Sequence, residues 1–131
     1  MSSIQDDPCI VVDFRRNSIR IFKRILRELE YPKYVRLLVN PIERTVAVQV
    51  SDHLDSRTHR VPNTIIGSRQ CYEIHSRSLL LMLLTCSGWD ENSAYRMYAS
   101  ACLDRQFVVF KMDDSVRLAD DPFTILRERS V

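Results

Sequence analysis

Hydrophobic residues recur along this chain at two spacings, one typical of helices and one typical of strands. Between residues 18 and 31 they return every three or four positions, and Pro32 then disfavours helix at the residue before it. This spacing predicts an amphipathic helix with one apolar side, whose start Asn17 or Ser18 can cap. That apolar side consists of Ile21, Phe22, Ile25, Leu26 and Leu29.

Two segments rich in β-branched and large apolar residues follow this helix. They cover residues 34–40 and 45–50, and the break between them contains Pro41, so they predict a β-hairpin. Short apolar segments at Cys9–Phe14 and Thr58–Val61 predict one strand before the helix and one after the hairpin. The predicted order of the first half is therefore β-α-β-β-β.

The second half repeats that order. Residues 76–89 predict a helix that ends at Gly88, since glycine readily adopts the left-handed conformation of a helix stop. Residues 94–102 and 106–112 predict a second hairpin, with flanking strands at Cys71–His75 and Ser115–Leu118. The predicted fold class is α+β, with two pseudo-repeated halves (about residues 9–61 and 71–118) whose helices pack on antiparallel sheet.

A length of 131 residues fits one domain, so we expect a single domain over residues 1–131. The tail at residues 119–131 carries Phe123, Ile125 and Leu126, so it is predicted to dock on that domain.

Composition narrows the functional classes. A net charge of +2 is too small to imply a polyanionic partner by itself, and a content of two glycines argues against glycine-rich phosphate loops. The four cysteines are dispersed without C-x-x-C spacing, which favours reduced thiols in a cytoplasmic protein. The longest apolar run, Leu79–Leu84, is far too short to cross a bilayer, and Met1–Pro8 is too polar for a signal peptide. We expect a cytoplasmic protein that does not enter a membrane.

The other side of the first predicted helix is basic, with Arg20, Lys23, Arg24 and Arg27. Like charges four positions apart cost roughly 0.2–0.5 kcal/mol per pair in an isolated helix. A basic helical face of this kind can neutralise nucleic-acid phosphates, which makes these four residues the candidate binding site. The alternative is a solvated surface whose charges pair with acidic side chains elsewhere in the fold.

The second predicted helix is apolar on every side along Leu79–Leu84. A helix that is apolar all round must be buried all round, so this run is predicted to be almost wholly buried, in the monomer or across a subunit contact. Either the C-terminal tail or a second subunit would cover it. The candidates for self-association are Leu79, Leu80, Leu81, Leu83 and Leu84.

No motif for catalysis or metal binding stands out. Cys71 and His75 would lie about 13 Å apart on a strand, too far to share an ion. Cys86 is near a helix C-terminus, where the helix dipole disfavours a thiolate. G-x-S-x-G, P-loop and dinucleotide fingerprints are missing from the sequence. We therefore expect a protein without enzymatic activity, metal or cofactor.

The duplicated β-α-β-β-β unit over Cys9–Leu118 is similar in topology to one domain of a DNA sliding clamp. Domains of that family form rings with helices lining the hole, so the resemblance implies that Arg20, Lys23, Arg24 and Arg27 face DNA. A TATA-binding-protein-like saddle is a second topological resemblance. Two hypotheses of function follow: a non-enzymatic nucleic-acid-binding accessory protein that uses the first helix, and a small oligomerising protein-interaction module that uses the second.

Overall fold

The structure is a computed structural model that describes residues 8–63 and 70–118. The predicted docking of the tail at residues 119–131 lies outside the described residues. The elements are, in chain order, β1 (Cys9–Asp13), β2 (Ser18–Phe22), α1 (Lys23–Glu28), β3 (Tyr34–Asn40), β4 (Thr45–Ser51), β5 (Thr58–Arg60), β6 (Cys71–Ile74), α2 (Arg77–Ser87), β7 (Ala94–Leu103), β8 (Phe107–Lys111), a 3-10 turn (Met112–Asp114) and β9 (Val116–Arg117).

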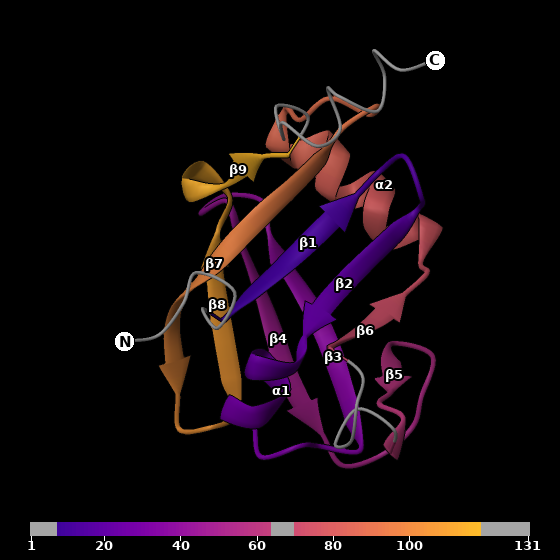
Figure 1. Cartoon of the computed structure of the whole chain (residues 1–131), viewed down its shortest axis with the longest axis vertical. Coiled ribbons are helices and arrows are strands. Elements are labelled where there is room, and N and C mark those ends of the chain that lie inside the picture. Colours follow the sequence, from indigo (N-terminus) through magenta and orange to yellow (C-terminus); the bar gives the residue numbers. More distant parts are fainter. Residues whose placement is uncertain (1–7, 64–69, 119–131) are drawn as a thin grey trace.

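All strands that the structure describes belong to one antiparallel sheet. Its order is β5-β3-β4-β8-β7-β1-β2-β6, and β9 also pairs with β7. The predicted α+β class with an antiparallel sheet is therefore confirmed. The sheet turns over on itself, so that β1, β2 and β6 lie in front of β3, β4 and β8 in Figure 1. β7 joins the two layers, since its first part pairs with β1 and its second part with β8, with a change of register between Ala99 and Ala101.

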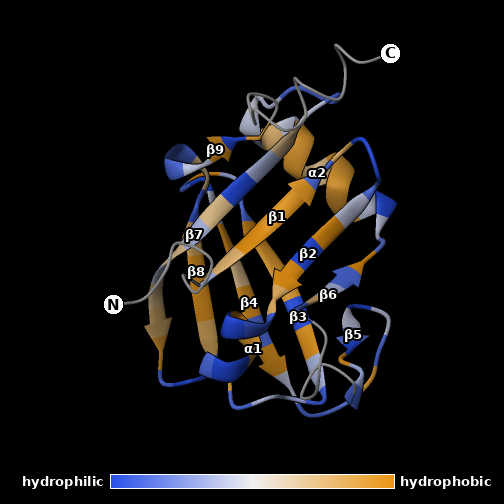
Figure 2. Ribbon diagram, viewed as in Figure 1, coloured by the Kyte–Doolittle hydropathy of each residue, from blue (hydrophilic) through white to orange (hydrophobic). Residues whose placement is uncertain are grey.

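A single hydrophobic core fills the space between the layers. Ile10 and Ile21 of the front layer share this core with Val48 and Phe110 of the back layer. The two helices lie at different ends of the sheet (Figure 1) and contribute further buried residues, which are Ile25, Leu26, Leu80 and Leu83. Each fully buried leucine or isoleucine stabilises the fold by about 1.5–3 kcal/mol. In Figure 2, α2 is hydrophobic along most of its length, whereas the visible side of α1 is polar.

The first predicted helix is wrong over its first five residues, because Ser18–Phe22 forms the strand β2. This strand is paired on both sides: Arg20 lies opposite Val11 of β1 and opposite Glu73 of β6. The two pairings satisfy the backbone groups that a longer helix would have satisfied internally. Only Lys23–Glu28 remains helical.

A turn that was not predicted from the sequence makes β2 possible. β1 and β2 form a hairpin whose turn ends at Asn17, with a left-handed φ of 51°. Asp13 Oδ1 accepts a hydrogen bond of 3.0 Å from the backbone N–H of Arg15 at the start of this turn. Asparagine tolerates positive φ and aspartate side chains bind nearby backbone N–H groups, so both residues favour a turn here.

The two halves of the chain do not share one order of elements. Residues 71–118 follow the predicted order, with β6, α2, β7, β8 and β9. Residues 9–61 contain the additional strand β2 between β1 and α1. Both predicted hairpins, β3–β4 and β7–β8, are present.

Candidate interaction surface

The four basic residues predicted to share a helical face lie on two elements. Arg20 is on β2, and only Lys23, Arg24 and Arg27 are on α1. The prediction of one basic face on one long helix is therefore wrong. The physical reason is the pairing of β2, which removes Arg20 from the helix.

Acidic side chains of the same chain pair with Arg20 and with Arg24. Arg20 Nη2 lies 3.6 Å from Oδ2 of the buried Asp13. Arg24 Nε donates a hydrogen bond of 3.2 Å to Glu28 Oε1, one turn further along α1. Arg27 is exposed. The Arg24–Glu28 pair lies at the surface and agrees with the alternative of a solvated basic face, on which such pairs contribute little to stability, whereas the Arg20 pair involves a buried carboxylate.

The second helix has clear signals at both ends. The Ser76 hydroxyl accepts a hydrogen bond of 3.4 Å from the N–H of Leu79, and Gly88 ends the helix with a left-handed φ of 78°. Between these ends, Leu80 and Leu83 point into the core and are 4% and 0% exposed.

The outward side of α2 is both apolar and exposed. Leu81 and Met82 expose 54% and 52% of their surface. The prediction that Leu79–Leu84 is almost wholly buried is therefore wrong within a single chain. The core accommodates one side of α2, and the other side remains at the surface.

The five leucines predicted for self-association also fall into a buried group and a group that is exposed or half-buried. Leu80 and Leu83 belong to the core and are not available to a partner. Leu81 is exposed, and Leu79 and Leu84 are half-buried.

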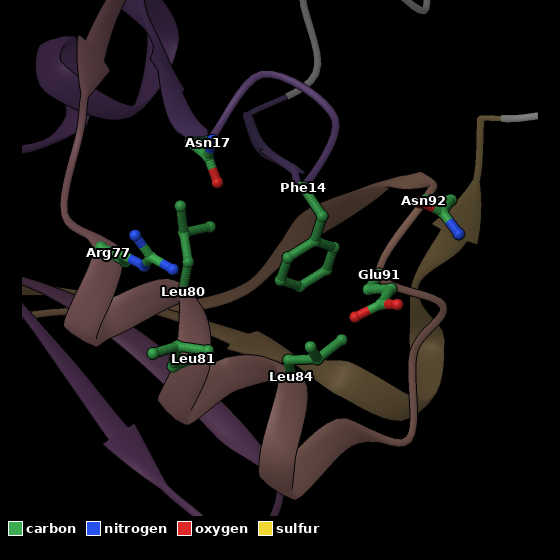
Figure 3. Close-up of a pocket in the computed structure, with 8 residues that line it drawn as sticks. All are labelled: Phe14, Asn17, Arg77, Leu80, Leu81, Leu84, Glu91 and Asn92. Atoms are coloured by element: carbon green, nitrogen blue, oxygen red, sulfur yellow. The ribbon is translucent and has the colours of Figure 1, made fainter.

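A hollow of about 370 Å³ lies between α2 and the turn that joins β1 to β2. Figure 3 shows Leu81 and Leu84 on the helix side of this hollow and Phe14 opposite them. Arg77 lies at one end, on the first turn of α2, and Glu91 lies towards the other end, on the loop after the helix. The hollow thus has an apolar middle and opposite charges at its two ends.

An aromatic cluster holds the loop that carries Glu91. The rings of Trp89 and Tyr95 stack with centroids 4.6 Å apart, and Phe14 meets them edge-on at 6.1 and 6.3 Å. The Tyr95 hydroxyl accepts a hydrogen bond of 2.8 Å from the backbone N–H of Asp90. Such ring pairs contribute about 0.5–1.5 kcal/mol beyond their burial. They therefore stabilise the position of this loop at the surface.

Two histidines near β5 are in different environments. His53 Nδ1 lies 2.7 Å from Asp52 Oδ1, and this hydrogen bond raises the pKa of the imidazole above its ordinary value. His59 is half-buried on β5, and burial lowers its pKa. In the described part of the chain, no three His, Cys, Asp or Glu side chains are placed to hold a metal ion.

Comparisons with family models, with curated proteins and with solved structures find no match to this chain. Its function is therefore inferred from its own residues and geometry. Neither of the α-helices in the described residues is long and apolar enough to span a membrane. The four cysteines, all of them within the described part, form no disulfide with one another.

Neither Arg77 nor Glu91 was predicted from the sequence as a functional residue. Arg77, Leu81 and Leu84 follow one another at helical spacing, which would have placed them on one side of the helix. No such rule connects Glu91 to them, because its position depends on how the loop after Gly88 folds.

Proposed function

We propose that this protein is a non-enzymatic interaction module that self-associates through one side of α2. The observation that carries the proposal is the exposed Leu81, which lies between Arg77 and Glu91 beside an apolar hollow (Figure 3). Together with the half-buried Leu84, on the same side of α2, it forms an apolar strip along the hollow. Contiguous exposed apolar surface with a polar rim is typical of protein–protein contacts.

The charges favour a second copy of the chain as the partner. Contacts between identical subunits are mostly two-fold, so that each surface meets itself. Two α2 helices packed antiparallel about an axis near Leu81 would bring Arg77 of each copy next to Glu91 of the other. A parallel arrangement would instead bring like charges together. The surface is thus complementary to itself in one orientation.

The expected association is weak. Full burial of one leucine side chain gains about 1.5–3 kcal/mol. Association costs on the order of 4–15 kcal/mol in lost translational and rotational freedom. Because Leu81 is the only large apolar side chain on this side of α2, itself wholly described, that is more than half exposed, we expect a concentration-dependent dimer.

Molar mass measured by sedimentation velocity over a concentration series tests the proposal. We expect 15.4 kDa at low concentration and a rise towards twice that mass. Arg77→Glu and Glu91→Arg should each weaken the dimer because like charges then meet, and the double substitution should restore it. Ile42→Glu, at a position 91% exposed in the β3–β4 turn, is the control and should leave the mass unchanged. A monomer at every concentration, or a double variant no better than the single ones, contradicts the proposal.

Nucleic-acid binding through α1 remains a second proposal. It is supported by the closeness of Lys23, Arg24 and Arg27 on a helix of six residues and by the exposure of Arg27. The acidic partners of Arg20 and Arg24 weigh against it. The resemblance to a sliding-clamp domain also remains a prediction, since no solved structure matches the chain and its first half contains an additional strand.

A further inference from the structure

One edge of β3 is only partly covered. β4 pairs with the whole of Tyr34–Asn40, whereas β5, on the other side, pairs with Tyr34–Arg36 alone. Along Leu37–Asn40 no described strand pairs with that second side. Free N–H and C=O groups at a sheet edge are a template for the addition of another strand.

A groove of about 480 Å³ lies between this open edge and α2. Leu38 and Val39 line it from β3, and Leu79 and Met82 line it from α2. Leu38 and Met82 are 39% and 52% exposed, so apolar surface borders the open edge from both sides. On a helix with 3.6 residues per turn, Leu79 and Met82 face away from the stripe of Arg77, Leu81 and Leu84. The groove is therefore separate from the proposed self-association surface.

The end of the groove near β5 is basic. Arg36, Arg57 and His59 line it, and no carboxylate does so within the described part of the chain. Arg36 is already paired with Asp55 at 3.2 Å. The exposed Arg57 forms no ion pair within residues 8–63 and 70–118. The groove thus offers an unpaired positive charge to an incoming acidic group.

We propose that this groove binds an extended peptide segment of another protein, as an additional strand on β3. In the antiparallel orientation, which is the more stable one, the segment pairs with β3 from Asn40 to Leu37. An apolar side chain of the segment then packs between Leu38 and Met82. A carboxylate about two residues later lies just past Leu37, where Thr58 of β5 takes over the pairing with β3, and there it can reach the neighbouring Arg57.

The walls of the groove favour a free segment over the sheet edge of a second folded copy. α2 lines it on one side and the loop at Ser56–Arg57 on the other, and we infer that these walls admit an extended chain more readily than the edge of a second folded sheet. Its volume lies within the range of about 300–1,000 Å³ that is usual for sites that enclose a ligand.

Selection of peptides from a random library against the full chain tests the proposal. We expect enrichment of an apolar residue followed about two positions later by Asp or Glu. Fluorescence anisotropy with the enriched peptide should give a Kd on the order of micromolar. Methylation of alternate backbone nitrogens of the peptide, which removes the donors that pair with β3, should abolish binding.

Three variants of the protein locate the peptide. Met82→Glu should weaken binding at least about tenfold, because it places a charge in the apolar part of the groove. Arg57→Gln should weaken it about threefold to tenfold at low salt and less at high salt, since salt screens exposed charges. Leu81→Glu, on the other stripe of α2, is the matched control and should bind the peptide as tightly as the parent. Melting curves check that each variant is folded.

The proposal is overturned if no sequence is enriched, if the enriched peptides lack an acidic residue, or if Met82→Glu binds them normally. It is also overturned if Met82→Glu lowers the molar mass of a dimer that Leu81→Glu leaves intact, because a second copy would then occupy the groove. Failure of peptide binding leaves the test of self-association unaffected, since the two surfaces use different stripes of α2.

Discussion

Arg44 caps the C-terminus of α2 by donating hydrogen bonds to Ser87 O at 2.9 Å and to Cys86 O at 2.7 Å. The last carbonyls of a helix have no partner within the helix, and the helix dipole there favours a positive charge. Arg44 belongs to the turn between β3 and β4 and lies 43 positions before Ser87. The hairpin thus holds α2 beside β3, which keeps the walls of the proposed peptide groove in place.

Replacement of Arg44 by methionine should therefore destabilise the protein. We expect the free energy of unfolding to fall by about 1–3 kcal/mol, because two helix carbonyls lose their donors. Arg44→Lys should have a smaller effect, since lysine keeps the charge without the fork of donors. Urea denaturation measures both. Arg57→Met, at an exposed arginine without an ion pair among the described residues, is the control, and an equal loss there would contradict the capping role.

Two leucines of α2 should respond differently to the same truncation. Leu83 is fully buried, so Leu83→Ala should cost about 2–5 kcal/mol through lost transfer energy and a cavity. Leu81 is 54% exposed, and Leu81→Ala should change the stability of the monomer by less than about 0.5 kcal/mol. Thermal unfolding at a concentration where the chain is monomeric compares them. Equal losses at the two sites would mean that α2 is oriented differently.

Local signals were sufficient for most of the fold. Pro41 in a short break between apolar segments predicted the β3–β4 hairpin, and Gly88 predicted the end of α2; both occur in the structure. They were sufficient because turn and stop residues act through their own backbone preferences.

The strand β2 could not be predicted in this way. Ile21 and Ile25 have helical spacing, whereas Ile19 and Ile21 have the alternation of a strand, so the segment fits both patterns. Two pairings decide between them: one with β1, through the turn that ends at Asn17, and one with Cys71–Ile74, about fifty residues away. The second contact cannot be predicted from the neighbouring sequence. Because residues 18–22 were assigned to the first helix, Arg20 was also wrongly placed on that helix.

Only part of the candidate surface was predicted, because tertiary packing also decides which side of α2 is exposed. The run Leu79–Leu84 contains no polar residue that marks its outer side, so the sequence could not show that Leu81 and Met82 are the ones left exposed. The groove depends on where β5 stops pairing with β3. That boundary follows from the turn at Asp55–Thr58, which the spacing of hydrophobic residues does not predict.

The two histidines near β5 should titrate on opposite sides of the ordinary imidazole pKa of 6.5. The hydrogen bond that the His53 imidazole donates to Asp52 raises the pKa of His53, so the stabilising contact is present below pH 6.5 and is lost as the pH rises through the higher folded pKa. Burial lowers the pKa of His59, so its protonation destabilises the fold as the pH falls below 6.5. NMR titration of the ring protons resolves both midpoints. Asp52→Asn should move the midpoint of His53 towards 6.5 without altering that of His59, and coincident curves in the parent protein would contradict this assignment.

Lys23 and Arg27 provide the test of nucleic-acid binding. Both are on α1, and Arg24 between them is already paired with Glu28. If these two side chains contact phosphates of duplex DNA, each releases condensed counterions, so the logarithm of the affinity falls with the logarithm of salt concentration by about 0.9 per contact. Replacing both by glutamine should flatten that slope by about 2 while the fold is kept.

Lys33→Gln with Lys111→Gln removes the same charge from exposed positions elsewhere and is the control. Absence of binding at low salt, or equal flattening by the control pair, would remove the nucleic-acid hypothesis, because the remaining attraction would then belong to net charge rather than to α1.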